Sequence, residues 1–480
     1  MANRDGGYHK AKVSKHKHQR IMKDSRDALN YGEMRVPRLF RKLFFPTLLG
    51  LVSSVLLNLA DGIFVGRGVG SDALAAINIA APVFQISTGI ALMFGSGVSV
   101  VAAVHMSKGN YKAANINVTQ AFTVGMLLMV LALIAINAFP RQTAALFGGS
   151  DMLFPMVHKY LVGVSPCLLF LVINMVGLFA IRLDGSPNYA MAVNAISAGL
   201  NIVLDWVFVF PLQWGIFGAA IATSVASFVG TLMVAFYFLK LSRQLKLYRP
   251  KFTRTALSLT ARNCGYMLQL GLPTFIAETA ISCMMITGNN MFMHYLHEDG
   301  VAAFSVACYL FPMIFMFGNA IAQSSLPIVS YNYGLGNTRR IRETLRLSAG
   351  LACALGLIMS ILGYVLAPQI VNLFIDSASA ANAIGETGIP LFLLTCLPFT
   401  LNVVLIGFLQ SMEQYRPATA FMLMRGFIVI IPCFILLPKA TGIHGLWLAE
   451  PLSETITLAT LLVYMVVKAR ASHAKKGAIS

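Results

Sequence analysis

Charged residues are scarce in this chain. Only 11% of its 480 residues are Asp, Glu, Lys or Arg, whereas 57% are hydrophobic. Soluble domains carry roughly 25% charged residues, so a soluble core of this length has no means of hiding so much apolar surface. The composition therefore excludes an ordinary soluble enzyme or binding domain and indicates a protein embedded in a lipid bilayer.

The chain also lacks the patterns that build metal, disulfide and catalytic sites. Its 7 cysteines fall singly in or beside apolar segments, with no C-x-x-C pair, and its 9 histidines form no convincing ligand set. Disulfide frameworks and zinc sites depend on such spacings. A paired-His motif and a nucleophile elbow are missing as well. We therefore expect no metal site, no catalytic residues and no enzyme activity.

A cleavable signal peptide is not evident at the start of the chain. The first apolar run begins only after residue 42, and the residues before it include twelve Lys or Arg. Signal peptides have a short basic region followed directly by an apolar one. We expect residues 1–42 to form a basic cytoplasmic tail that is largely disordered.

Long apolar runs, by contrast, are abundant, and at about 20 residues a span twelve of them can be drawn. The odd-numbered connections hold only four basic residues, which are Arg67, Arg141, Lys159 and Lys439. Basic residues collect on the cytoplasmic side, so we expect a multi-pass protein of the cell's inner (plasma) membrane with both termini in the cytoplasm. The net charge of +18 is then a topology signal, and no nucleic-acid partner is expected.

The sequence repeats itself at a constant offset. A shift of 227 residues brings Pro46-Thr47 onto Pro273-Thr274, and GIFG at 215–218 onto GIHG at 442–445. Each half holds six spans and keeps the same orientation. Parallel repeats are related by an axis along the membrane normal and meet at a cavity, which indicates a protein that moves a solute.

We therefore predict an all-α membrane protein with twelve transmembrane helices in two six-helix bundles related by a pseudo-twofold axis. The expected segments are the tail at 1–42, the N-terminal lobe at 43–239, a basic cytoplasmic linker at 240–262, the C-terminal lobe at 263–468 and a cytoplasmic C-terminal tail at 469–480.

Acidic residues inside spans are functional candidates, because a carboxylate in hydrocarbon costs at least ~2.5–3.5 kcal/mol. Asp61 and Asp205 share a depth in the outer half of the bilayer by residue count. Asn201 lies one turn before Asp205 on the same face, and Thr223 lies about two turns into span 6. Together they would suit a proton or a sodium ion; the alternative is that each merely joins helices.

Other charged groups within spans are candidates for substrate binding or coupling. Glu278 lies near mid-span 7, five residues after Pro273, and its alternative role is helix packing. On span 12 we expect Glu450 to be solvated near the outer surface and Glu454 to be the cavity acid. Arg425 is the lone basic residue within a span, and we expect it to pair with an acid or with backbone carbonyls.

The stretch NLADGIFVGRGVGSDALAAINIAAP, from Asn58 to Pro82, resembles the first span and loop of the multidrug and toxic compound extrusion (MATE) family. The resemblance continues through NIVLD, GIFGAAIAT and GLWLAEPLSE and covers nearly everything between residues 38 and 468. It implies a two-lobed exporter that exchanges Na⁺ or H⁺ for organic, often cationic, compounds by rocking between two states. No cofactor beyond the coupling ion is implied, and we expect a monomer.

The same resemblance implies residue roles. Asp61, Asn201, Asp205 and Thr223 match the cation site of the family's N-terminal lobe. In the second lobe some sodium-coupled members use acids from spans 7 and 10, but here Glu278 is placed differently and span 10 holds no acid away from its ends. The resemblance therefore argues against a cation site in the C-terminal lobe.

Two other functions fit the same architecture. A flippase for a lipid-linked saccharide would share the fold, but it would need cavity cations, and only Arg425 is available within the spans. A membrane sensor that transports nothing is the alternative of another class. Flux of a solute in sealed vesicles separates transport from sensing.

Overall fold

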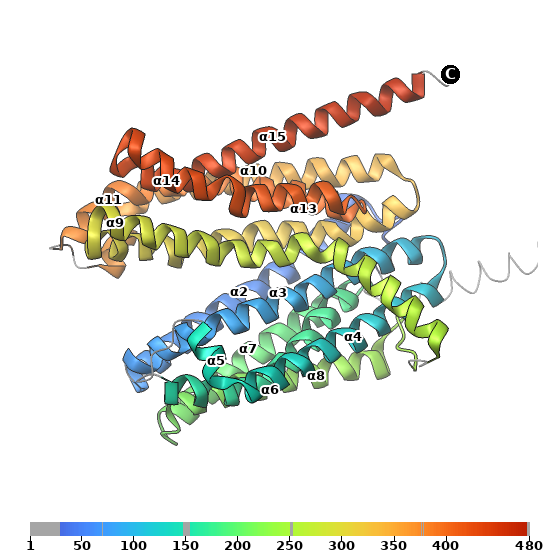
Figure 1. The fold of residues 1–480 in the computed structure, drawn as a ribbon. Helices are drawn as coiled ribbons and strands as arrows, with labels where there is room; N and C mark the ends of the chain where they lie inside the picture. The colour runs from blue at the N-terminus through green and yellow to red at the C-terminus, as the bar shows by residue number, and fades with distance from the viewer. Residues whose placement is uncertain are drawn as a thin grey trace, which may run out of the picture.

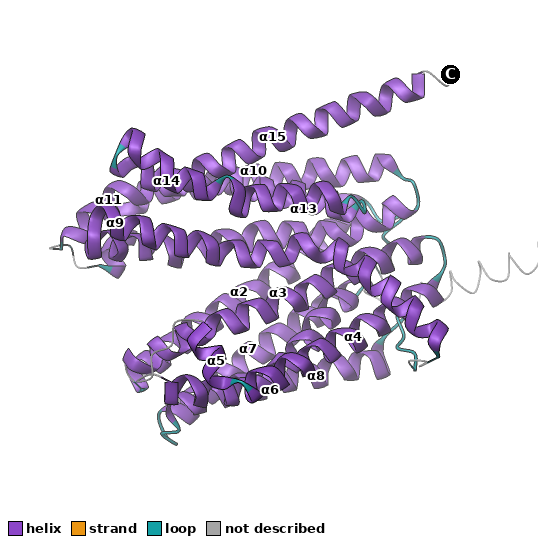
Figure 2. Cartoon of the chain, in the orientation of Figure 1, coloured by secondary structure: helices purple, strands orange, loops and turns teal. Residues whose placement is uncertain are grey.

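The computed structural model describes residues 29–69, 71–146, 154–249, 253–375, 377 and 379–477. The expected disorder of the N-terminal tail falls mostly on residues 1–28, outside the described part. Figure 2 shows that helices make up nearly all of the described chain, and no residue in those ranges is assigned to a strand. The all-α prediction is confirmed.

The described residues of the N-terminal half form seven α-helices and one π-helical turn. They are α2 (Val36–Gly68), α3 (Ser71–Ser107), α4 (Tyr111–Ala138), α5 (Pro140–Leu146), α6 (Phe154–Leu183), α7 (Pro187–Val209), α8 (Gly215–Phe236) and η1 (Tyr237–Leu241).

The described residues of the C-terminal half form three long helices, of 81, 37 and 35 residues, and several shorter elements. Its elements are α9 (Arg254–Gly334), α10 (Thr338–Phe374), α11 (Ala380–Phe392), η2 (Leu393–Thr395), α12 (Cys396–Ser411), α13 (Tyr415–Leu423), η3 (Met424–Ile428), α14 (Ile430–Thr441) and α15 (Ile443–Gly477).

Several helices begin at side-chain caps. Asn110, Asn337 and Ser379 each accept a hydrogen bond from a backbone N–H in the first turn of α4, α10 and α11. Such caps satisfy backbone groups that lack a partner inside the helix. The first helix, α2, starts at Val36, seven residues before the expected start of the N-terminal lobe, and α9 starts inside the expected linker.

Eleven helices in the described part are long and apolar enough to cross a membrane. One of these, α9, is 81 residues long and contains two spans. His297 divides them, because its φ of 53° and ψ of −149° are incompatible with a helix. Counting α9 as two spans gives the twelve that the sequence predicts.

The two lobes have separate hydrophobic cores. One core is built mainly from α3, α4, α6 and α8, and the other from the C-terminal helices, including Trp447 and a group of phenylalanines around Phe304. In Figure 1 the α2–α8 bundle and the α9–α15 bundle converge at one end and diverge toward the end that holds α5 and α11. This arrangement confirms the predicted two-bundle fold.

The lobes meet mainly along α3 and α9. Glycine allows their backbones to touch, since a Cβ at Gly97 would collide with the carbonyl oxygen of Met267, and a Cβ at Gly271 with that of Met93. Small residues at helix crossings permit this kind of approach in membranes. Gln410 of α12 reinforces the seam by donating to the hydroxyl of Ser96 on α3 at 3.3 Å.

Candidate functional site

Helices α2, α7 and α8 bring the four predicted N-lobe residues to the same part of the bundle. Asp61 comes from α2, Asn201 and Asp205 from α7, and Thr223 from α8, and α7 packs against both of the other helices. Asp205 has no exposed surface and Asn201 only 2%, whereas Asp61 and Thr223 are half-buried.

The two acids lie close enough for their charges to interact with each other. Both also lie within electrostatic range of the phenol of Tyr160 from α6. Their hydrogen-bonding capacity is unused. Within the described residues, Asp61 Oδ1, both carboxylate oxygens of Asp205 and Asn201 Nδ2 are buried without a hydrogen-bond partner. Buried polar groups are almost always paired, because an unpaired one costs free energy. A proton or a cation between the acids would supply what these oxygens lack.

Thr223 offers the N-lobe site only the lone pairs of its hydroxyl. Its hydroxyl donates to the carbonyl oxygen of Ala219 one turn back on α8, at 3.1 Å, so its lone pairs remain available as acceptors. Tyr160 was not singled out from the sequence. The signal for it is weak, since one tyrosine among fifteen near the end of an apolar run has no distinguishing spacing.

Glu278 lies at the seam between the lobes. Gln85 of α3 donates from Nε2 to Glu278 Oε2 at 3.1 Å, so an N-lobe amide meets the C-lobe acid. One turn along α3, a Cβ on Gly89 would press against Phe275 and lie 3.6 Å from Glu278 Cβ, which makes this a close crossing. The sequence alone does not reveal Gln85 as a site residue, because an uncharged amide in a span carries no charge signal.

A small cavity lies beside this seam, between the lobes. Its volume is about 40 Å³, and both lobes line it, with Ser96 and Phe179 on one side and Thr274, Asn319 and Gln410 on the other. Ser96 and Thr274 also hydrogen bond to each other at 3.0 Å. The lining offers hydroxyl and amide groups and aromatic faces, but no formal charge.

The C-terminal lobe encloses a compact charged cluster. Arg425 donates from Nε to Glu454 Oε1 at 2.8 Å, and its guanidinium lies 4.2 Å from the ring centroid of Phe399. Asn402 donates to Glu454 Oε2 at 2.7 Å. Of the two partners expected for Arg425, an acid or backbone carbonyls, the structure shows the acid, which is Glu454. Because both carboxylate oxygens of Glu454 are bonded and the residue is 1% exposed, it makes its contacts inside the lobe.

The expectation that Glu450 is solvated is wrong, since only 3% of it is exposed. The chain turns sharply at Gly442, whose φ is 66°, and α15 then packs back along α14 and α11. This packing covers the first turns of α15. Counting residues from the end of a span gives depth in the membrane but does not reveal which neighbouring helices cover a side chain.

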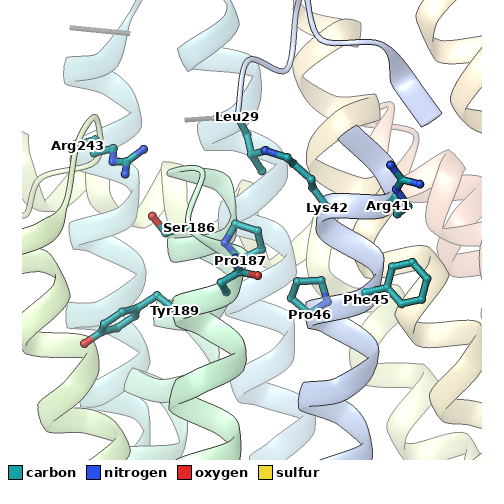
Figure 3. A pocket seen from close by; sticks show the side chains of 10 residues that line it. Leu29, Arg41, Lys42, Phe45, Pro46, Ser186, Pro187, Tyr189 and Arg243 are labelled. Carbon is teal, nitrogen blue, oxygen red and sulfur yellow. The ribbon is translucent and has the colours of Figure 1, made fainter. Parts of the chain in front are cut away.

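A larger pocket of about 360 Å³ lies where α2, the start of α7 and the segment after η1 meet. Figure 3 shows Lys42 from α2 and Arg243 from that segment on opposite sides of it, with Arg41 nearby. Asp184 at the end of α6 holds the same segment, because its carboxylate accepts hydrogen bonds from the backbone N–H groups of Arg243, Gln244 and Leu245.

Comparison with known proteins agrees with this architecture. The MatE family profile matches twice, at residues 46–207 and 273–435. The two matches begin 227 residues apart, which is the offset of the internal repeat. Among curated relatives, the multidrug export protein MepA of Staphylococcus aureus (strain MRSA252) is 24% identical over 440 residues, covering 88% of this chain and 92% of the relative. A protein of Shewanella oneidensis named FAD transporter is 25% identical over 438 residues, covering 89% and 94%.

Solved structures share the fold. An outward-facing multidrug resistance MATE family transporter of the MOP superfamily aligns with a TM-score of 0.83 at 22% identity, covering 91% of this chain and 96% of that one. A MOP superfamily transporter from Pyrococcus furiosus aligns with a TM-score of 0.82, also at 22% identity, covering 91% and 96%. The chain therefore belongs to the MatE family of membrane transporters.

Proposed function

We propose that this protein is a secondary active efflux transporter that exchanges H⁺ or Na⁺ for small organic compounds, often cationic, by alternating access of its two lobes. The observation that carries the proposal is the pair Asp61 and Asp205, in which Asp61 Oδ1 and both carboxylate oxygens of Asp205 are buried and lack hydrogen-bond partners within the described residues. A relative named as a multidrug export protein, aligned over most of both chains, supports the substrate class.

Binding and release of the cation at Asp61 and Asp205 would drive the cycle. An external cation neutralises the acids and favours the conformation that discharges substrate outward; it then leaves toward the cytoplasm. The cation can do this only if its affinity differs between the two conformations. The α3–α9 seam, where Gln85 meets Glu278, is the interface that must rearrange.

The membrane orientation is part of the proposal. Both termini would lie in the cytoplasm of a cell whose plasma membrane holds the protein, and the protein would act as a monomer. The pocket lined by Arg41, Lys42 and Arg243 supports this orientation, because basic side chains gather at the cytoplasmic face of membrane proteins (Figure 3).

The residues that line the inter-lobe cavity carry no formal charge and favour cationic or neutral substrates over anionic ones. The buried Arg182 at the seam is engaged with Gln323 of that lining, to which it donates at 2.8 Å. The relative named FAD transporter raises the alternative of an anionic dinucleotide. Arg425, however, is committed to Glu454, and the cavity beside the seam is lined by uncharged groups. An anionic solute would find no free guanidinium among these residues, and the same holds for the phosphates of a lipid-linked saccharide.

Efflux from proteoliposomes tests the proposal. The purified protein is reconstituted with ethidium as the probe, and either a pH gradient or a Na⁺ gradient is applied. Uphill movement with one gradient identifies the coupling ion. Failure with both gradients for ethidium and for several other organic cations, with a correctly folded protein, would overturn the assignment; movement of FAD instead would identify an anionic substrate.

A further inference from the structure

The internal repeat aligns two acids of the C-terminal lobe with two hydroxyl-bearing residues of the N-terminal lobe. The shift that brings GIFG onto GIHG also brings Thr223 onto Glu450 and Ser227 onto Glu454. A similar contact is present in both lobes: Asn174 donates to the Ser227 carbonyl oxygen at 3.0 Å, and Asn402, one residue beyond the position equivalent to Asn174, donates to that of Glu454 at 2.8 Å. Thus α15 carries carboxyl groups where α8 carries part of the predicted cation site.

One acid of this pair is already neutralised. Glu454 receives Arg425 on one oxygen and Asn402 on the other, so the arginine and this glutamate form a closed unit without net charge. Their hydrogen bonds also fix the orientation of the Asn402 amide. Buried ion pairs persist only when both partners are satisfied in this way.

Glu450 is the acid without compensation. It is 3% exposed, and its Oε2 atom has no hydrogen-bond partner among the described residues. The ionisable groups that face it are Glu454 on its own helix, Arg425 from η3, and the thiols Cys283 from α9 and Cys433 from α14. The single arginine is already paired, so an ionised Glu450 would be a second negative charge in a buried place.

We propose that the C-terminal lobe has a proton-binding site of its own at Glu450, one helical turn from the Arg425–Glu454 pair. A proton on the carboxyl group removes the uncompensated charge without needing further ligands. A metal cation suits the place poorly, because hard cations take several oxygens and the adjacent guanidinium repels them. Besides Glu450, Asn402 Oδ1 is the cluster oxygen left unpartnered.

The acid of this site, Glu450, belongs to span 12, whereas the resemblance to sodium-coupled relatives would place C-lobe acids on spans 7 and 10. Those two spans contribute Cys283 and Asn402 to its surroundings instead. The site is separate from Asp61 and Asp205 in the other lobe. The presence of the proton on Glu450 does not depend on the proposed function. Only the further step, in which release of this proton accompanies the conformational cycle, rests on that function.

Infrared difference spectroscopy of the purified protein tests the proton itself. The C=O stretch of a protonated carboxylic acid is compared in wild type, Glu450→Gln, Asp205→Asn and Glu298→Gln, the last being an exposed glutamate at the turn within α9. We expect Glu450→Gln to lose a protonated-carboxyl band that both other variants keep. Retention of every band in Glu450→Gln would overturn the proposal.

Two further arms keep the test decisive. If Glu450→Gln does not fold, Glu450→Thr installs the side chain that the N-terminal lobe carries at the equivalent position, and the same band must be lost. Spectra recorded with and without Na⁺ separate proton from metal binding, since loss of the wild-type band on Na⁺ addition would contradict a proton site. Uphill efflux retained in Asp205→Asn would overturn the proposed function and leave the spectral result for Glu450 untouched.

Discussion

Gln85 and Glu278 meet across the two lobes, with the amide of the first donating to the carboxylate of the second at 3.1 Å. They come from α3 and α9, the helices that form the main inter-lobe contact, and beside them the side chains of Phe275 and Glu278 pack against Gly89 of α3. A hydrogen bond to a charged group contributes about 1.5–3 kcal/mol. This contact therefore links the relative position of the lobes to the ionisation state of Glu278 within the membrane.

A double-mutant cycle tests that contact. Gln85→Ala and Glu278→Ala should each lower the apparent melting temperature. The double variant should melt only slightly lower than either single variant. The expected coupling is on the order of 1–3 kcal/mol, because either substitution removes the same hydrogen bond. Thermal unfolding in detergent measures it. Additive losses in the double variant would show that the two side chains do not act on each other.

Glycine at the crossing of α3 and α9 predicts a steric effect. Gly97→Val should prevent the lobes from packing, because a side chain there meets the Met267 carbonyl, which belongs to the backbone and has little freedom to move. Gly265→Val is the matched control on α9, since nothing lies within 4 Å of a Cβ at that position. Size-exclusion chromatography after heating reads the outcome, and equal survival of the two variants would contradict the packing account.

For the Arg425–Glu454 pair we predict that removing one partner destabilises the protein more than removing both. Arg425→Met leaves Glu454 buried without its cation, and breaking a buried pair in this way costs about 3–5 kcal/mol. The double variant Arg425→Met with Glu454→Leu should recover part of that loss, because no charge remains unpaired. Folded yield and melting temperature give the comparison. A double variant less stable than Arg425→Met alone would refute this explanation.

We predict that the hydrogen bonds of Asp184 protect the segment between the lobes from proteolysis. Asp184→Ala removes the acceptor for three backbone N–H groups and for the Tyr237 hydroxyl, which donates at 2.7 Å. We expect trypsin to cleave more rapidly after Arg243 or Lys246, since the backbone there loses its anchor. Asp184→Asn, which keeps one acceptor oxygen, should be intermediate. Unchanged cleavage in Asp184→Ala would mean that other contacts hold this segment.

Much of the fold could be predicted from the sequence, because each span needs its own apolar run and the repeat offset survives without a gap. The pairing of Asp61 with Asp205 also follows from local geometry, since depth is countable at 1.5 Å per residue along a helix. The tight turn at His297 was harder to foresee: two spans are joined there by a single non-helical residue, so no loop separates them.

Features that depend on tertiary packing were not predictable. Glu450 sits near the end of its span, and the packing of α15 against neighbouring helices, α11, α12 and α14 among them, buries it. Gln85 has no charge to mark it and gains its role from a partner 193 residues away. The choice of Glu454 by Arg425 likewise depends on the juxtaposition of η3 and α15 rather than on spacing along the chain.

The most direct measurement of the central claim is uphill efflux of ethidium in proteoliposomes containing wild type, Asp205→Asn or Asp299→Asn. Asp299 is an exposed acid in the turn region of α9 and serves as the matched control. We expect Asp205→Asn to remain folded and inserted but to lose all movement against the gradient, while Asp299→Asn behaves like wild type. Uphill efflux retained in Asp205→Asn would contradict the claim that this buried carboxylate binds the coupling ion.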